Sequence, residues 1–481
     1  MKKFFKSLLL VLIILPMAFI FTACGKVTIV DIQKTNSTDL VDIYTVYYSD
    51  GTTSSITIQN GKDGSNFDVE ALFQMGVARG AYTDDLAGYQ KFLMDLTKNS
   101  SSTIEANNNL NKALQSAVSI YTIVPSNNST AIACGSGVIY QMDETYSYIL
   151  TNYHVLYNAL VAETGDFVDD VYIFQYGVDC SIVTNSRTNK QEIKGDYVLG
   201  KYIAGSMTYD VAVVEVKTAD LVKNNSTVRA ADIATSYHAG DQIYAIGNPE
   251  GDGISITKGI VSVESENIQM TAVDGYSTSQ FRVARIDAAI NGGNSGGGVF
   301  NENGELIGLV NSKSVYAASD ETTPIDGMAY ALPIDNVKCV ADNLMYYYSV
   351  NKKFSTVYKL QLGVYFNNVD KNTSQVYNPV TGECVIYDQI VVASDPELNA
   401  FIRKYKVQET GKEATYIQTG DIITHIIIND KTYKLDRYFY LENMLLSVRP
   451  GDNVAFIISR GNVSLTTGSV SVQASDLVVK A

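Results

Sequence analysis

Histidine and tryptophan are scarce in this chain of 481 residues. Tryptophan is absent, and the three histidines are His154, His238 and His425. No two of them are close enough for the H-E-x-x-H pattern, which excludes a zinc protease of that type. The sequence therefore predicts chemistry that uses no metal and no cofactor.

Cysteine is also scarce. The chain has five cysteines, and no two of them form a C-x-x-C pair, so a metal or redox role has no support. Apart from Cys24, the cysteines Cys134, Cys180, Cys339 and Cys384 allow three full disulfide pairings. A chain of this length can also be stable without any disulfide, so the sequence leaves their state open.

Positive charge is in deficit. The chain has 36 lysine and arginine residues against 51 aspartate and glutamate residues, a net charge of −15. Nucleic-acid binding relies on a basic face. We therefore expect no nucleic-acid partner.

Only the first residues hold a long apolar run. Lys2, Lys3 and Lys6 precede apolar residues 8–21, a run that is too short and too early for a membrane span but typical of an export signal over 1–23. The signal predicts that the mature chain works outside the cytoplasm.

The end of this signal resembles a bacterial lipoprotein cleavage site. The segment reads F-T-A-C-G, although Phe21 stands where such sites usually have leucine. The resemblance implies lipidation of Cys24 and anchoring to the extracytoplasmic face of the membrane, in the cell envelope. The alternative is an ordinary signal peptide that is cut near Ala23.

The secondary structure that the remaining sequence predicts changes along its length. Residues 24–66 predict a small β-rich stalk module, because strand-like runs flank the turn signal S-D-G-T-T. Residues 67–116 predict a helical linker, because apolar side chains recur there on one helical face. Short strand-like runs divided by glycine, asparagine and aspartate follow from residue 117, which favours barrels or a sandwich.

Glycine surrounds one serine in this β-rich part. Residues 287–300 read D-A-A-I-N-G-G-N-S-G-G-G-V-F, with five glycines around Ser295. Glycine lets a substrate and backbone amides approach the same hydroxyl, so Ser295 is a candidate nucleophile. A flexible loop with an inert serine is the alternative. A phosphate-binding loop is excluded, because no G-K-[ST] follows the glycines.

Two upstream residues favour the nucleophile. His154 lies at the end of the apolar run I-L-T-N-Y-H-V, and Asp210 precedes the apolar run V-A-V-V-E-V. The G-x-S-x-G elbow of α/β-hydrolases fits poorly, because its acid and histidine follow the serine and a helix comes next. The order histidine, aspartate, serine is that of chymotrypsin-like enzymes.

Several motifs in this order resemble the HtrA/DegP family of trypsin-like serine proteases. They are T-N-Y-H-V, Y-D-V-A-V-V, A-I-G-N-P-E-G followed by I-T-K-G-I-V-S, D-A-A-I-N-G-G-N-S-G-G, and G-M-A-Y-A-L-P. The resemblance implies a mainly β fold, with a chymotrypsin-like double β-barrel protease domain over residues 117–345.

The resemblance also implies roles for single residues. Ser295 would attack the peptide carbonyl, His154 would transfer the proton, and Asp210 would orient the imidazole. The amides of Gly293 and Ser295 would form the oxyanion hole. Ala329 and Tyr330 would line the pocket for the residue before the cut, which in this family favours small or medium aliphatic side chains.

The sequence departs from the family pattern in three places. Gly292 and Gly298 replace prolines that are usual there, so we expect a looser backbone around Ser295. The interval between His154 and Asp210 also carries an apparent insertion around residues 161–201.

Residues 352–481 resemble a PDZ domain, an α+β fold. The motifs are L-G-V-Y-F, G-D-I-I-T-H-I-I-I-N-D, a helix over 435–448, and R-P-G-D-N-V-A-F-I-I-S-R. Such domains bind an extended peptide and hold its carboxylate on backbone amides, here those of Leu362, Gly363 and Val364. The alternative is a β-rich cap without a ligand, and His425 is expected to be structural.

Together these features predict an envelope-anchored serine endopeptidase of HtrA type that cleaves unfolded or damaged proteins. Family resemblance also implies a homotrimer. The alternative is a proteolytically idle, peptide-binding or chaperone-like surface lipoprotein.

Overall fold

The chain forms two compact units, Met1–Asn109 and Leu110–Ala481. The computed structural model describes residues 13–14, 29–37, 41–48, 51–59, 73–74, 77, 83, 88–89, 91–92, 109–126, 129–162, 170–187, 190–313, 316–317, 320–324, 327–352, 356–363, 373–377, 384–393, 402–408 and 413–480. Cys24 and Val364 lie outside these residues, so the predicted lipid attachment and one predicted peptide-binding amide do as well.

The first unit contains an antiparallel sheet. β3 (Val41–Tyr48) pairs with β2 (Ile29–Ser37) on one side and with β4 (Thr53–Gln59) on the other, and β1 (Ile13–Ile14) pairs with β4. Gly51 has a φ of 82° in the β3–β4 turn, a left-handed conformation that suits glycine. The hairpin lies where S-D-G-T-T predicted one.

Aromatic side chains gather in the later part of this unit. The ring centroid of Phe73 lies 4.7 Å from that of Tyr89 and 5.7 Å from that of Phe92. The described residues here are helical except Thr83, in agreement with the predicted helical face.

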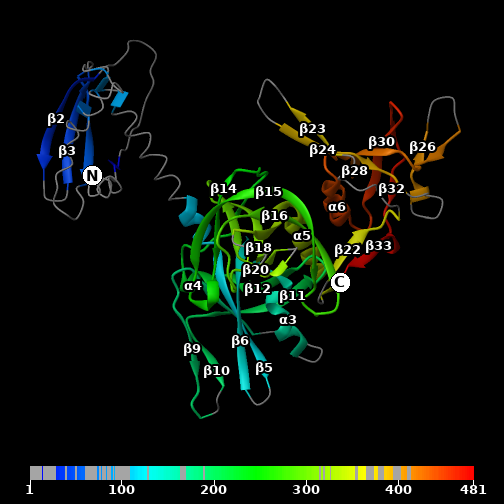
Figure 1. The fold of residues 1–481 in the computed structure, drawn as a ribbon, viewed down its shortest axis with the longest axis horizontal. Helices are drawn as coiled ribbons and strands as arrows, with labels where there is room; N and C mark the ends of the chain where they lie inside the picture. Colours follow the sequence, from blue (N-terminus) through cyan, green and yellow to red (C-terminus); the bar gives the residue numbers. More distant parts are fainter. Residues whose placement is uncertain are drawn as a thin grey trace. The chain divides into compact units, whose positions relative to one another are not determined.

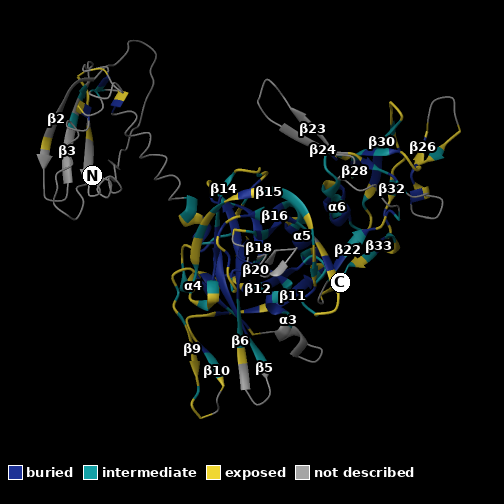
Figure 2. Ribbon diagram, viewed as in Figure 1, coloured by how far each residue is buried: buried dark blue, intermediate teal, exposed yellow. Residues whose placement is uncertain are grey.

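The second unit begins with a closed six-stranded barrel in the order β11-β12-β7-β6-β5-β8 (Figure 1). Its interior holds buried valine and isoleucine side chains from several strands, and Figure 2 colours much of the ribbon of this barrel as buried. The strands are β5 (Ala117–Ser126), β6 (Ser129–Met142), β7 (Tyr146–Thr151), β8 (Val171–Gln175), β11 (Val198–Ser206) and β12 (Val211–Lys217), with helices α3 (Tyr153–Ala162) and α4 (Thr218–Asn224).

Two pieces of the apparent insertion at 161–201 belong to this barrel. It supplies β8 and the start of β11, and the segment between them forms a hairpin of β9 (Cys180–Thr184) and β10 (Gln191–Gly195). The hairpin carries exposed apolar side chains such as Ile182 and Val183.

A second barrel follows. Its strand order is β13-β18-β17-β14-β15-β16-β21, and pairing of β18 with β21 closes it. The strands are β13 (Asp232–Ile233), β14 (Gln242–Gly247), β15 (Ser255–Thr271), β16 (Thr278–Ile286), β17 (Gly298–Asn301), β18 (Glu305–Lys313) and β21 (Ala329–Pro333), with the 3-10 helix η2 (Pro249–Gly251) and the short pair β19 (Tyr316–Ala317) and β20 (Asp320–Pro324). The predicted chymotrypsin-like double barrel is confirmed.

Helix α5 (Ile334–Asn351) follows the second barrel and ends where Lys352 takes a left-handed φ of 51°. The domain boundary expected at residue 345 falls inside this helix. An unbroken helix carries the chain out of the barrels because its apolar side chains pack on both sides, with Val337 and Val340 in the barrel core and Tyr347 in the core that follows.

The C-terminal part is a sheet with one helix, α6 (Tyr438–Ser447), which lies within the predicted range 435–448. Its six-stranded sheet contains β25 (Ile390–Val391), β28 (Ile422–Ile428), β29 (Lys431–Lys434), β30 (Asn453–Arg460), β31 (Val463–Thr466) and β32 (Val470–Ser471). Outside it lie the pairs β22 (Val357–Leu360) with β33 (Leu477–Lys480), β23 (Thr373–Tyr377) with β24 (Cys384–Asp388), and β26 (Lys406–Val407) with β27 (Thr415–Tyr416), and the 3-10 helices η5 (Ile402–Lys404) and η6 (Ala474–Asp476).

Helices α5 and α6 are joined by polar and apolar contacts. Asn443 on α6 donates a hydrogen bond of 2.8 Å to Asp335 and accepts one of 3.0 Å from Asn336, both on α5. Leu446 on α6 lies in the same apolar cluster as Val337 and Val340. Among the described residues, none of the helices has the length and apolar character needed to cross a bilayer.

Candidate active site

The pairing of β7 with β12 brings His154 next to Asp210. Thr151 at the end of β7 lies opposite Ala212 near the start of β12. His154 follows the end of β7, as the second residue of α3, and Asp210 directly precedes β12. Because the strands run antiparallel, the two side chains lie at the same edge of the barrel.

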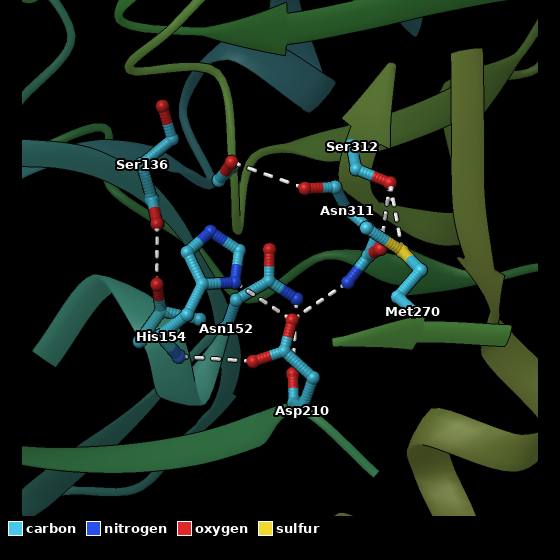
Figure 3. Close-up of polar contacts among 9 residues, drawn as sticks. Ser136, Asn152, His154, Asp210, Met270, Asn311 and Ser312 are labelled. Atoms are coloured by element: carbon cyan, nitrogen blue, oxygen red, sulfur yellow. Dashed lines mark hydrogen bonds and ion pairs between the residues drawn. The ribbon is translucent and has the colours of Figure 1, made fainter. Parts of the chain in front are cut away.

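The carboxylate of Asp210 orients the imidazole of His154 (Figure 3). Asp210 Oδ2 lies 2.7 Å from His154 Nδ1, and Asp210 Oδ1 accepts a 2.9 Å hydrogen bond from the His154 backbone amide. A carboxylate can only accept, so Nδ1 carries the proton. The neutral ring is therefore left with Nε2 as a base.

Two asparagines hold Asp210 in turn. Asn311 Nδ2 donates a 2.6 Å hydrogen bond to Asp210 Oδ2, and Asn152 Nδ2 donates a 3.0 Å bond to the Asp210 carbonyl. Asp210 has a left-handed φ of 49°, and its side chain is only 8% exposed. The left-handed region admits aspartate and asparagine more readily than most residues, so backbone and chemistry agree at this position.

Burial and charge act in opposite directions on His154. Burial lowers the pKa of the imidazole, whereas the charge of Asp210 and the hydrogen bond to it raise the pKa. The net direction is upward. Asp210 thus stabilises the protonated form that an imidazole takes when it accepts a proton.

Ser295 lies on the loop that connects β16 and β17 of the second barrel. His154, Asp210 and Ser295 all line one cavity of about 420 Å³. Ser295 Oγ donates a 3.1 Å hydrogen bond to the backbone carbonyl of Asn311. None of the hydrogen bonds between described residues joins Ser295 to His154, so the serine hydroxyl is turned toward Asn311.

The loop leaves two backbone amides available. The carbonyl of Gly292 accepts a 2.7 Å hydrogen bond from the amide of Glu250, and the carbonyl of Asn294 accepts a 2.9 Å bond from that of Gly297. A trans peptide directs its N–H opposite to its C=O. The amides of Gly293 and Ser295 therefore point away from those donors, and neither donates to any described residue.

The two unusual glycines have different surroundings. A Cβ at Gly292 would meet only Glu250 Oε1, at 3.5 Å, whereas a Cβ at Gly298 would lie 2.3 Å from the Phe300 ring. Gly298 is buried in β17. A side chain at 298 would therefore have to displace the buried Phe300 ring, and the looser backbone expected there from the sequence stays a prediction.

Comparisons with known proteins agree with this geometry. Residues 135–309 match the family of trypsin-like peptidase domains. The protein is a serine endopeptidase.

Two curated relatives and one solved structure illustrate the similarity. The Do-like serine protease HtrA of Lactococcus lactis subsp. cremoris is 27% identical over 347 residues, 71% of this chain and 72% of the relative. The Do-like serine protease HtrA of Bacillus subtilis is 25% identical over 340 residues, 70% and 67% of the two chains. The structure of the HtrA-type protease AlgW with a tripeptide is 21% identical, with a TM-score of 0.41, and the match covers 76% of this chain and 96% of that one.

The cavity of this endopeptidase has apolar walls. Met207, Met270, Ala272, Val273 and Ile290 contribute to the lining. The predicted pocket residues Ala329 and Tyr330 do not line it. They lie on β21, where Tyr330 is opposite Ser312, which does line the cavity.

Other predicted residues lie elsewhere in the endopeptidase. Leu362 and Gly363 follow β22 in the C-terminal part, and His425 lies on β28, where its Nδ1 is 3.0 Å from Thr424 Oγ1. Among the described cysteines, Cys134, Cys180 and Cys339 are free thiols. In the described part of the chain, no three histidine, cysteine or acidic side chains cluster as metal ligands.

The sequence did not point to Asn311, Asn152 or Ser136, although Figure 3 draws polar contacts of all three. Asn152 is the residue between Thr151 and Tyr153 in the T-N-Y-H motif, so its nearness to His154 was visible. Ser136 contacts Gly293 and Asn311 contacts Asp210, partners that are distant in sequence, so neither residue carried such a signal.

Proposed function

We propose that the endopeptidase cleaves peptide bonds through Ser295, His154 and Asp210. The observation that carries this proposal is the pair of contacts between His154 and Asp210, 2.7 Å and 2.9 Å, at a cavity that Ser295 also lines. The contacts leave Nε2 free to accept a proton inside the cavity.

The reaction follows from these positions. Ser295 Oγ attacks the scissile carbonyl carbon while its proton passes to His154 Nε2, and the carbonyl electrons move onto oxygen. The amides of Gly293 and Ser295 donate to this oxyanion. The carbonyl then reforms, the C–N bond breaks, and the amine leaves with the proton from His154. Water repeats the sequence on the acyl-enzyme and releases the acid.

The serine hydroxyl must first turn. Its hydrogen bond to the Asn311 carbonyl is 3.1 Å long and uses the proton that His154 has to receive. In the proposed reaction the hydroxyl gives up this acceptor and turns toward the imidazole. The bond to Asn311 thus describes the resting hydroxyl.

We further propose an HtrA-type role for the whole protein. In this role it is lipid-anchored through Cys24 in the cell envelope, cleaves unfolded or damaged proteins, and assembles as a homotrimer. The C-terminal part would act as a PDZ domain, with a peptide carboxylate held at Leu362–Val364. Sequence similarity to HtrA-type proteases over about 70% of the chain supports this reading.

Labelling with a fluorophosphonate probe tests the proposed chemistry. The wild-type protein should react with the probe and cleave casein, whereas Ser295→Ala should not react and should lose turnover by about 10⁶-fold. A metal chelator should change neither the labelling nor the casein cleavage of the wild-type protein. A folded wild-type protein that neither reacts nor cleaves casein would instead support an idle, peptide-binding protein.

A further inference from the structure

The proposed oxyanion hole depends on the backbone conformation of Gly293. Its φ is 90°, and a Cβ there would lie 2.2 Å from the carbonyl oxygen of Asn248. Turning the peptide between Gly292 and Gly293 by half a rotation would bring φ back to the usual negative range. That rotation would also point a carbonyl, rather than an amide, at the oxyanion.

The peptides on both sides of Gly293 are held by donors. On one side, the backbone amide of Glu250 donates a hydrogen bond of 2.7 Å to the Gly292 carbonyl. On the other side, the Ser136 hydroxyl donates 2.7 Å to the Gly293 carbonyl. Both contacts hold carbonyl groups away from the cavity, so the left-handed conformation at Gly293 is stabilised from its two ends.

Ser136 also contacts the rest of the nucleophile loop. Its backbone amide donates a hydrogen bond of 2.9 Å to the Ser295 carbonyl. Its backbone carbonyl accepts one of 2.7 Å from Thr151 Oγ1. A Cβ at Gly296 would lie 2.4 Å from that carbonyl. One completely buried serine therefore contacts the loop on both sides of the nucleophile and the strand that precedes His154.

A second residue fixes the direction of the Ser136 hydroxyl. The backbone amide of Asn248 donates a hydrogen bond of 2.8 Å to Ser136 Oγ. Since an N–H can only donate and a carbonyl can only accept, the hydroxyl proton must point toward Gly293. The Asn248 side chain is fully buried and is itself held by Tyr121 at 3.0 Å and by the Gly253 amide at 2.7 Å.

We infer that Ser136 is a positioning residue of the oxyanion hole, with Asn248 setting the direction of its hydroxyl proton. The inference rests on the proposed function, because it assigns Ser136 a task in that reaction. Ser136 touches neither the substrate nor the reacting atoms. It acts by keeping the Gly293 amide directed at the site where the oxyanion develops.

The test compares Ser136→Ala with Ser147→Ala. Ser147 is also completely buried in the first barrel, and its hydroxyl shares a 2.8 Å hydrogen bond with Thr218 Oγ1, outside the site. Both variants lose one buried hydroxyl, so both should lose similar thermal stability. A quenched fluorescent peptide copied from the main casein cleavage site gives kcat and KM.

Ser136→Ala should lower kcat by about 10- to 100-fold, less than the loss expected when an oxyanion donor is removed outright. Its KM should change by less than about twofold, because an interaction made only in the transition state is weakened. A peptide aldehyde, whose hemiacetal oxygen occupies the hole, should bind more weakly by a factor similar to the fall in kcat. Ser147→Ala should leave all three values at the wild-type level.

The outcomes separate this inference from the proposed function. A wild-type protein that does not react with fluorophosphonate removes both. If the wild type reacts but Ser136→Ala matches Ser147→Ala in kcat and aldehyde affinity, the inference about Ser136 alone is wrong. Ser136→Cys, which keeps a side chain of similar size with a weaker donor, gives the same comparison if Ser136→Ala does not fold.

Discussion

At the scale of single residues, Asp210 determines how His154 works. Its carboxylate accepts from the ring and from the backbone amide of His154, so it fixes the tautomer and the ring plane together. It also raises the pKa of the imidazole against the opposing effect of burial. Charge and geometry at His154 thus depend on one side chain.

Asp210→Asn separates these effects. The side-chain amide of an asparagine would donate a hydrogen bond to His154 Nδ1. This favours the imidazole tautomer that carries its proton on Nε2, and a protonated Nε2 cannot accept the hydroxyl proton of Ser295. We expect kcat to fall by roughly 10³- to 10⁴-fold with little change in folding. Kinetics on the fluorescent peptide and circular dichroism measure the two effects.

The same variant should change the pH profile. The proposed reaction requires neutral His154, so wild-type kcat/KM should rise with pH through a pKa above the ordinary histidine value of about 6.5. Without the charge of Asp210 only burial remains, and burial lowers the pKa, so the acid limb of Asp210→Asn should move to lower pH. An unchanged acid limb would show that Asp210 does not control this titration.

At the scale of elements, the nucleophile loop depends on some of its glycines more than on others. Gly293 combines a left-handed φ with a close carbonyl, whereas Gly292 has neither. The missing proline before G-N-S therefore matters less than the glycine that follows it. The local conformation is set by hydrogen bonds from Ser136 and Glu250, which compensate for the flexible sequence.

Gly293→Ala and Gly292→Ala form a matched pair. Gly293→Ala should lower kcat/KM by about 10²-fold or more, because the added Cβ strains the left-handed backbone and favours rotation of the peptide that carries the oxyanion amide. Gly292→Ala should stay within about twofold of wild type. Equal losses in the two variants would contradict the role of Gly293.

Much of the proposed site could be predicted from the sequence because each residue of the proposed triad lies beside a readable element. His154 and Asp210 adjoin apolar strands, and Ser295 lies among glycines, so order and local pattern identified them. Ser136, Asn248 and Asn311 act through contacts between residues more than 100 positions apart. A single sequence gives no signal for such pairs.

The strands of the insertion were missed for another physical reason. The segment around residues 161–201 looked like an addition, yet it provides β8 and part of β11. The place of β8 in the barrel depends on pairing with β5, which is distant in sequence. Local propensity predicts a strand but does not identify its partner.

At the scale of the second unit as a whole, the barrels and the C-terminal part exchange core residues. Leu446 of α6 lies in a barrel cluster, while Tyr347 of α5 lies in the C-terminal cluster. Asn343 of α5 also donates 2.7 Å to the Leu446 carbonyl. We therefore expect the stability of the barrels to depend on α6 as well.

Adjacent leucines test this dependence. Leu445 lies in the C-terminal core and Leu446 in the barrel core, and each alanine substitution should cost about 2–5 kcal/mol. Hydrogen exchange should rise in both β12 and β30 for Leu446→Ala but only in β30 for Leu445→Ala. The same exchange pattern in both variants would mean that the cores unfold as one.

The left-handed backbone at Asp210 also bears on how this sequence can change over generations. Asparagine tolerates that conformation as aspartate does, and their codons differ by a single base. One point mutation could therefore silence hydrolysis without disturbing the fold. In related genomes this codon is the place to distinguish sequences that have kept the enzyme from those that have kept only its scaffold.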